Sequence, residues 1–299
     1  MSANTTLTAI DGITVGHYTD VDARTGCTVI VLPEASIVAG EIRGGAPATR
    51  EFGLLAAGMT VQHANALVLT GGSAYGLAAA QGVMQELESL RRGYTTTTAV
   101  VPIVPTAALY DLGVGSAAIR PSASSGAAAF RAASTEPVPQ GLVGAGTGAT
   151  CAKWRGEKIA GGLGSAAVQV GDATVAAMAA VNALGDVFSL EGESLTGGPP
   201  VAAALTTPPA EGENTTLAVV ATDAALTRDQ LERLLVRAHD AYGACLRPAH
   251  TSFDGDICFA VSTGKAQGEV HNLAEGAFEA VGRAIENAAI AARDQSASA

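Results

Sequence analysis

The feature that most constrains the fold is a series of short apolar runs, each bounded by glycine, proline or aspartate and most of them rich in β-branched residues. Runs of this length and composition predict strands buried on both faces, because a half-exposed strand would alternate apolar and polar residues. Five such runs are spread along the chain: Thr28–Leu32, Ala66–Thr70, Ala99–Val104, Leu217–Ala221 and Ile257–Val261. We therefore expect a core built on β-sheet.

Helical patterns lie between these predicted strands, and the clearest one runs from Leu226 to Leu246. Thr227 and Gln230 have the spacing of a capping box, and apolar residues then recur every three or four positions. A second helical pattern spans Leu273–Arg293. With 36 glycines and 4% aromatic residues, the chain has small side chains that let helices approach sheets closely. The pattern predicts the α/β class.

We predict a single domain over residues 1–299, because no stretch separates two halves with independent patterns. The segment Glu191–Asn214 is rich in glycine, proline and glutamate and comes nearest to a linker. We interpret it as a long surface loop within the one domain.

Charge and cysteine content exclude several classes of partner. The net charge of −11 gives no attraction to nucleic acids or anionic membranes. The uncharged stretch Phe52–Gln85 is interrupted by glycine and polar residues, so no piece approaches the ~20 apolar residues of a membrane span. The first ten residues lack the features of a secretory signal. Four cysteines far apart in sequence favour reduced thiols in a cytoplasmic protein without a metal site.

Two glycine-rich segments invite other interpretations. Gly144–Ala149 is close to a dinucleotide-binding fingerprint, but its third glycine comes one place early and no acidic residue follows at the expected distance. Gly71–Ser73 follows a predicted strand as a nucleophile elbow would, but Tyr75 stands where that motif needs its second glycine. A helix cap or a loop residue is the simpler interpretation of Ser73.

A set of motifs along most of the chain resembles the self-processing aminopeptidase/D-esterase family, which includes L-aminopeptidase/D-esterases, β-aminopeptidases and hydrolases of nylon (6-aminohexanoate) oligomers. The matching segments are Gly16–Tyr18 with Asp20, Thr25–Val29, Arg43–Pro47, Gly71–Leu77, Val101–Pro105, Gly144–Ala149, Val181–Ala183 and Gly185–Asp186. The resemblance implies a four-layer αββα sandwich like that of N-terminal-nucleophile hydrolases, with different connectivity. It also implies that one precursor is cleaved just before a serine or threonine.

The cleaved bond that this resemblance implies is His250–Thr251, which would divide the chain into residues 1–250 and 251–299. The Phe253–Asp256 context resembles the threonine branch of the family, which contains the nylon-oligomer hydrolase. Cleavage would free both a hydroxyl and an α-amine on Thr251. Because an α-amine has a pKa of about 7.7–8.0, the residue would supply nucleophile and general base together.

Two further site residues are implied by the motifs. Asn182 matches the family asparagine that donates to the tetrahedral oxyanion, and Lys153 matches the lysine of the nylon-hydrolase branch, although Ala152 stands where glycine is expected. The alternatives are a turn asparagine and a solvated surface lysine. The family also implies an acidic partner downstream of the nucleophile, and spacing alone does not choose among Asp254, Asp256, Glu275, Glu279 and Glu286.

These residues predict a cytoplasmic, autoprocessed amidohydrolase that acts on small peptides or amides bearing amino groups. No metal or organic cofactor is implied, since the nucleophile, base and oxyanion donor are all protein groups. The resemblance and the low charge density favour a homo-oligomer. The alternatives are an acyltransferase like ornithine acetyltransferase, which is similar in fold and in its threonine nucleophile, and a non-catalytic protein that binds a small ligand in its glycine-rich loops.

Overall fold

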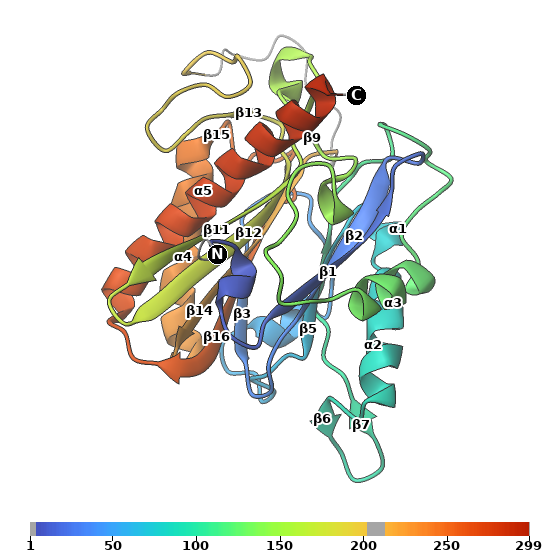
Figure 1. Cartoon of the computed structure of the whole chain (residues 1–299), viewed down its shortest axis with the longest axis vertical. Helices are drawn as coiled ribbons and strands as arrows, with labels where there is room; N and C mark the ends of the chain where they lie inside the picture. The colour runs from blue at the N-terminus through green and yellow to red at the C-terminus, as the bar shows by residue number, and fades with distance from the viewer. Residues whose placement is uncertain (1–3, 202–212, 299) are drawn as a thin grey trace.

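The computed structural model describes residues 4–201 and 213–298, which form two five-stranded sheets packed face to face (Figure 1). The first sheet has the order β1 (Thr14–Asp20), β2 (Thr25–Val31), β5 (Ala66–Thr70), β8 (Thr106–Ala108) and β4 (Ala48–Arg50). The second has the order β11 (Leu163–Val170), β12 (Ala173–Asn182), β14 (Thr215–Ala224), β16 (Ile257–Ala266) and β3 (Ile37–Ile42). In these two sheets, as far as the structure describes the chain, β5 with β8 and β14 with β16 are the parallel pairs and the other pairs are antiparallel.

Helices cover the outer face of each sheet and complete four layers, which confirms the predicted αββα sandwich (Figure 1). The first sheet carries α2 (Ala79–Ser89) and α3 (Ala123–Arg131), and the second carries α4 (Arg228–Cys245) and α5 (Val270–Ala297). The remaining short elements are α1 (Ser73–Gly76), β6 (Tyr94–Thr95), β7 (Val100–Val101), β9 (Thr150–Cys151), β10 (Ile159–Ala160), β13 (Asp186–Val187), β15 (Leu246–Arg247), and the 3₁₀ turns η1 (Leu7–Ala9), η2 (Phe52–Leu55), η3 (Gly144–Gly146) and η4 (Lys153–Arg155).

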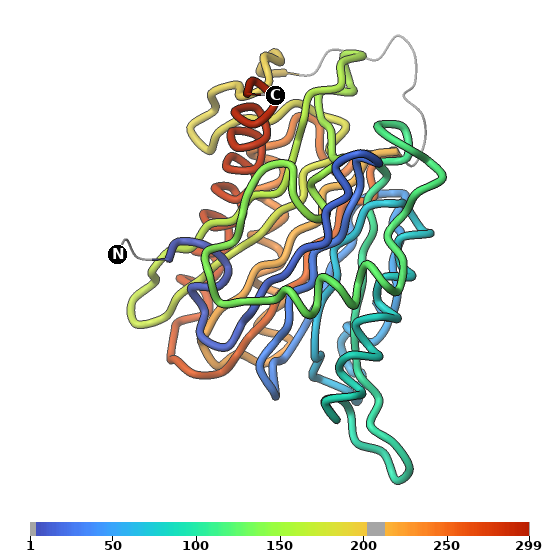
Figure 2. Tube along the Cα trace, turned by 45° about the vertical axis from the view of Figure 1, so that its right-hand side comes forward, coloured from blue at the N-terminus to red at the C-terminus, as the bar shows by residue number. Residues whose placement is uncertain are grey.

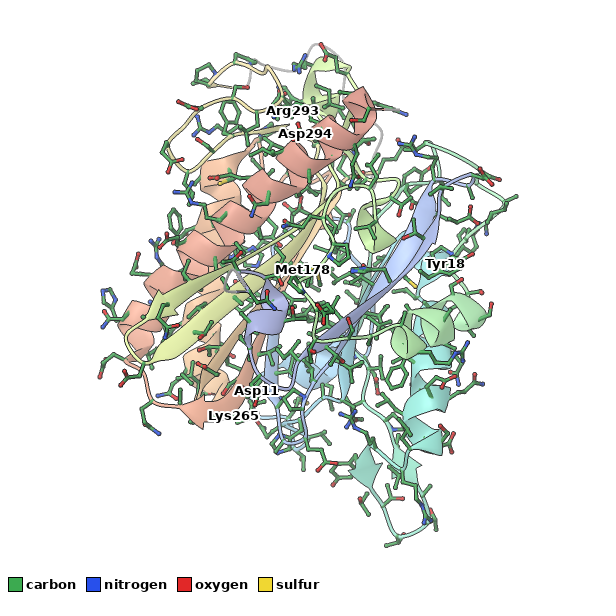
Figure 3. The ribbon with its side chains drawn as sticks, viewed as in Figure 1. Asp11, Tyr18, Met178, Lys265, Arg293 and Asp294 are labelled. Carbon is green, nitrogen blue, oxygen red and sulfur yellow. The ribbon has the colours of Figure 1, made fainter. Side chains whose placement is uncertain are left out.

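Alternate residues of each central strand pack into different cores. On β14, Leu217 and Val219 face the layer between the two sheets, whereas Ala218 and Val220 face α4 and α5. Met178 of β12 also lies between the sheets (Figure 3). Because both faces are covered, the strands read as continuous apolar runs, which is why their positions are visible in the sequence.

Small residues set the close approach of helix and sheet. A Cβ atom on Gly164 of β11 would lie 2.1 Å from the carbonyl oxygen of Ala284 in α5. The predicted cap of α4 is also present, since the Thr227 side chain accepts a hydrogen bond from the backbone N–H of Gln230. These contacts confirm the interpretation of the small-residue composition and of the helix that begins after Thr227.

The predicted strand Ala99–Val104 is wrong. Only Val100–Val101 is extended, and it pairs with β6 in a small outer hairpin, while Thr106–Ala108 provides the strand of the first sheet. Proline has no backbone N–H, so Pro102 and Pro105 cannot donate to a ladder inside a sheet. The N–H groups of Ile103 and Val104 bond to side chains instead.

The two glycine-rich segments form local structures of different kinds. Gly144–Gly146 forms a 3₁₀ turn followed by a two-residue strand, rather than the strand-to-helix turn of a dinucleotide site. Ser73 is the first residue of the short helix α1 and follows Gly72, which has the left-handed φ of +80°.

The segment Glu191–Asn214 is only partly among the described residues, because 202–212 lies outside them. Its described portions, 191–201 and 213–214, connect β13 to β14. In the described part of the chain, none of the helices has the length and apolar character that crossing a membrane requires.

Candidate active site

Three strands of the second sheet meet at one edge, near the labels β9, β13 and β15 in Figure 1. β12 ends there at Asn182, and β14 begins there at Thr215 because it runs antiparallel to β12. β16 is parallel to β14 and begins at the same edge, directly after the segment 251–256. The tube in Figure 2 shows β12, β14 and β16 side by side along their length. The topology thus collects segments from three distant parts of the sequence.

Asn182 lies opposite Thr215 in the ladder between β12 and β14. Partners in register point to the same face of a sheet, and this face is the layer between the two sheets. The Asn182 side chain is fully buried. Its Nδ2 donates to the carbonyl oxygens of Tyr110 at 3.0 Å and Glu213 at 3.2 Å, and its Oδ1 accepts from the N–H of Thr150 at 3.0 Å. Asn182 is therefore a fixed interior donor and not a turn residue.

Lys153 approaches the same point from the first turn of η4. Ala152, just before it, has a left-handed φ of +64°, which explains why glycine would be the easier residue there. The Lys153 ammonium donates to Asn182 Oδ1 at 3.0 Å and to the carbonyl oxygen of Glu213 at 3.3 Å. Burial lowers the pKa of Lys153 to about 8. Lys153 is thus held inside the site and is not a solvated surface lysine.

Thr215, the ladder partner of Asn182, carries a hydroxyl two residues after the Glu213 carbonyl to which both side chains donate. It is 3% exposed, and its Oγ1 lies 2.5 Å from the carbonyl oxygen of Asn214, the residue before it. The backbone N–H of Gly255 donates to that same carbonyl oxygen at 2.7 Å. A Cβ atom on Gly255 would lie 2.6 Å from Thr215 Oγ1, so the absence of a side chain at 255 makes room for the hydroxyl.

Thr251 lies on the other side of Asp254. Its Oγ1 donates to Asp254 Oδ2 at 2.5 Å and its backbone N–H donates to the same oxygen at 3.1 Å. Within residues 4–201 and 213–298, no hydrogen bond joins Thr251 to Asn182 or Lys153. The structure therefore brings Asn182 and Lys153 into contact with each other and with residues 213–215, and it leaves Thr251 outside that group.

Asp254 and Asp256 form a buried acidic pair between the two threonines, each 1% exposed. Asp254 accepts from the N–H of Leu184 at 3.3 Å in addition to Thr251. Burial, and then the neighbouring Asp256, raise the pKa of Asp254 to about 6. Asp256 Oδ1 accepts from the N–H of Thr216 at 2.7 Å, which connects the acidic pair to the start of strand β14.

The residue before Thr251 is clamped by Asp256. Both the backbone N–H and the Nδ1 of His250 lie within 3.0 Å of Asp256 Oδ2, and His250 has a left-handed φ of +55°. The acidic residues of α5 are engaged elsewhere or exposed: Glu275 pairs with Arg237, Glu286 pairs with Arg283, and Glu279 is exposed. Of the acidic candidates left open by the sequence, the structure places Asp254 and Asp256 at the site.

Sequence reasoning missed Thr215 and the roles of Gly255 and Glu213. The available signal is the triplet Asn214–Thr216, in which two hydroxyl residues stand between a glycine- and proline-rich loop and an apolar strand. Local pattern gives such a threonine no more weight than Thr251, since only the strand register puts it opposite Asn182.

No metal site is visible at this edge or elsewhere in the described ranges, where no three histidine, cysteine or carboxylate side chains come together. The cysteines Cys27, Cys151, Cys245 and Cys258 are all free and buried. The groups available for chemistry at the edge are therefore hydroxyls, carboxylates, an amide and an ammonium.

The chain is similar to known proteins over most of its length. The model of peptidase family S58 matches residues 5–298. An uncharacterised aminopeptidase of Mycobacterium tuberculosis is 42% identical over 290 residues, which cover 86% of this chain and 81% of the relative. A 6-aminohexanoate-oligomer endohydrolase of Agromyces sp. is 32% identical over 269 residues, covering 84% of this chain and 73% of the relative.

Solved structures share the fold at lower sequence identity. The L-aminopeptidase D-Ala-esterase/amidase from Ochrobactrum anthropi, described as a variant of the Ntn hydrolase fold, superimposes with a TM-score of 0.77 at 21% identity, covering 97% of this chain and 87% of that one. A β-aminopeptidase of Burkholderia sp. gives a TM-score of 0.72 at 24% identity, with coverage of 96% and 86%.

Proposed function

Because this chain belongs to peptidase family S58 and is therefore a hydrolase of the aminopeptidase and amide-hydrolase type, we propose that it is an autoprocessed amidohydrolase with a threonine nucleophile. The observation that carries the proposal is the convergence of Asn182 and Lys153 on residues 213–215. We assign Thr215 as the nucleophile that this convergence favours, in place of the Thr251 that the motif comparison favours.

The first reaction is cleavage of the chain's own Asn214–Thr215 bond. Thr215 Oγ1 attacks the carbonyl carbon of Asn214, the C–N bond breaks, and an ester forms. The hydroxyl proton passes to the nitrogen, which becomes the α-amine of Thr215. The N–H of Gly255, already 2.7 Å from the carbonyl oxygen, stabilises the negative charge that develops on it. Water then hydrolyses the ester and leaves a carboxylate on Asn214.

The second reaction is turnover of an external amide by the freed Thr215. Its Oγ1 attacks the carbonyl carbon of the substrate, the C–N bond breaks, the amine leaves with the proton taken from the hydroxyl, and water hydrolyses the resulting ester. The α-amine takes the proton of the hydroxyl, since its ordinary pKa of about 7.7–8.0 is close to neutral. When the carbonyl of Glu213 moves away from Asn182 Nδ2, that N–H becomes available to the oxyanion of the substrate. Lys153 has its pKa lowered to about 8, so it exchanges protons with the α-amine near neutral pH.

Thr251 is the second candidate nucleophile, and a specific contact favours it. Its Oγ1 is 2.5 Å from Asp254, a carboxyl group with a pKa raised to about 6, which is a suitable general base. In that case the cleaved bond is His250–Thr251. The carbonyl oxygen of Thr251 is itself engaged by Gly45 and Asp254, which holds this residue within a turn.

The substrates that we propose are small peptides or amides bearing amino groups, as the names of the relatives indicate for those proteins. The named relatives are hydrolases, so we favour release of the acyl group to water over its transfer to an amine. We also propose a cytoplasmic setting, supported by four free and buried cysteines, and a homo-oligomer, supported by the low charge density.

Intact-mass analysis of the purified protein tests these assignments. Cleavage before Thr215 gives residues 215–299, about 8 kDa of the 29.6 kDa chain, whereas cleavage before Thr251 gives residues 251–299, about 5 kDa. We expect the C-terminal fragment of about 8 kDa in the wild type and in Thr251→Ser. We expect an uncleaved, inactive chain in Thr215→Ala. A 5 kDa fragment would transfer the role to Thr251, and hydrolysis of amides by a chain that stays whole would overturn autoprocessing.

A further inference from the structure

A small cavity of about 20 Å³ lies next to Lys153 and Glu213, the residue two positions before the candidate nucleophile. Tyr110, Thr150, Lys153, Lys158 and Glu213 are among its lining residues. Glu213 is the residue two positions before Thr215, so the chain itself forms one wall of this cavity in the uncleaved protein.

The carboxylate of Glu213 has a specific partner in this cavity. The Tyr110 hydroxyl donates a hydrogen bond to it, and burial together with the negative charge of Glu213 raises the pKa of Tyr110. The backbone of Glu213 is fixed as well, since its carbonyl oxygen accepts from Asn182 Nδ2 and from Lys153 Nζ. Both the backbone and the side chain of this residue are therefore held.

Lys158 brings an uncompensated positive charge to the same cavity. Its Nζ lies 3.6 Å from the position of a Cβ on Gly113, and its charge is close enough to lower the pKa of Lys153 further. Among the residues that the structure describes, no carboxylate forms an ion pair with Lys158. An exposed, unpaired ammonium that lines the same cavity as a phenol hydroxyl is a suitable recognition site for a carboxylate.

We propose that Tyr110 and Lys158 form a carboxylate-binding subsite. It binds a carboxylate on the acyl side of the substrate, two residues before the cleaved bond. Lys158 is the specificity-determining residue, and the Glu213 carboxylate, bound to Tyr110 but not paired with Lys158, lines the subsite until the chain is cleaved and moves away. The inference rests on the proposed function with Thr215 as nucleophile, because that assignment puts Glu213 two residues before the cleaved bond. It restricts the substrate class to peptides or amides with an acidic acyl unit.

The test compares two dipeptide p-nitroanilides, glutamyl-asparaginyl and glutaminyl-asparaginyl, on processed enzyme. We expect wild type to favour the glutamyl substrate in kcat/KM by about fivefold, mainly through KM, as a partly exposed ion pair supplies. The Lys158→Gln variant removes this preference and Lys158→Glu reverses it. Lys265→Gln is the matched control, because Lys265 pairs with Asp11 at 2.5 Å at the opposite end of β16 (Figure 3).

The outcomes separate the inference from the proposed function. Equal kcat/KM for the two substrates in wild type, or a preference that survives Lys158→Gln, would overturn the carboxylate-binding subsite and leave the hydrolase assignment intact. Processed enzyme that hydrolyses neither substrate and no other amide would overturn the proposed function, and the subsite with it. A preference abolished equally by Lys265→Gln would reduce the effect to long-range charge.

Discussion

At the scale of single residues, burial decides what each polar group of the site can do. Asn182 has both of its amide hydrogens bonded to carbonyl oxygens. Lys153 donates to two oxygens of Asn182 and shares the carbonyl oxygen of Glu213 with the Asn182 amide. The motif comparison identified both residues from the sequence. It did not identify Thr215, because a threonine before a strand is common and nothing local marks this one.

The lowered pKa of Lys153 predicts a pH dependence of stability. The folded chain loses this proton near pH 8, whereas the unfolded chain keeps it until about pH 10.5. Between these values the unfolded state binds more protons, so the free energy of unfolding rises with pH. We expect Lys153→Met to remove a rise of about 3 kcal/mol across that window. Urea unfolding at pH 8 and pH 10 measures this rise. The same change of the unfolding free energy with pH in wild type and in Lys153→Met would contradict the assignment.

At the scale of elements, the site depends on where strands begin and end. Apolar runs located β5 at its observed bounds, the second half of β2, the middle of β14 and the first half of β16, and the capping box located the start of α4. The hydrophobic pattern misplaced one strand. Pro102 and Pro105 fit an apolar run, but they have no backbone N–H to donate to a strand ladder, which a hydrophobic pattern does not show. Gly255, in the turn before β16, shows how an element boundary also shapes the site.

Gly255→Ala is expected to abolish or strongly slow processing. The added Cβ would lie 2.6 Å from both Thr215 Oγ1 and the carbonyl oxygen of Ala46, and displacing the hydroxyl by about 1 Å costs roughly 100-fold in rate. The time course of fragment appearance on a gel measures the effect.

The matched control for this variant is Gly243→Ala in α4, where a Cβ meets nothing within 4 Å. Alanine there raises stability by about 0.5–1 kcal/mol through its higher helix propensity and leaves processing unchanged. Processing of Gly255→Ala at the wild-type rate would show that the turn does not position Thr215.

At the scale of the whole molecule, one buried side chain joins distant segments. Arg228, at the start of α4, is 4% exposed and donates five hydrogen bonds. Its acceptors are the carbonyl oxygens of Val38, Leu54, Ala56, Val61 and Gln62. The helical pattern identifies the helix around Arg228, but a charged residue in a first turn would be expected on the surface.

We expect Arg228→Leu to destabilise the protein by about 3–5 kcal/mol, because it leaves buried carbonyl groups without a donor. The exposed Arg233 of the same helix provides the control, and Arg233→Leu is expected to change stability by less than about 0.5 kcal/mol. Equilibrium urea unfolding compares the two. A loss below about 1 kcal/mol in Arg228→Leu would mean that the loop 54–62 is held by other contacts.

The sequence by itself determined the class of fold and of enzyme. Doubly covered strands and helices with small residues produce periodicities that are local, and the family motifs are local as well. The tertiary structure alone decided which hydroxyl lies opposite Asn182, which carboxylates lie in the same part of the fold and which chain segment lies against Lys153. Those facts follow from the pairing of Asn182 with Thr215 and of β14 with β16, contacts between residues far apart in the chain. Register of this kind is set by the packing of both faces of a sheet at once, which no single segment encodes.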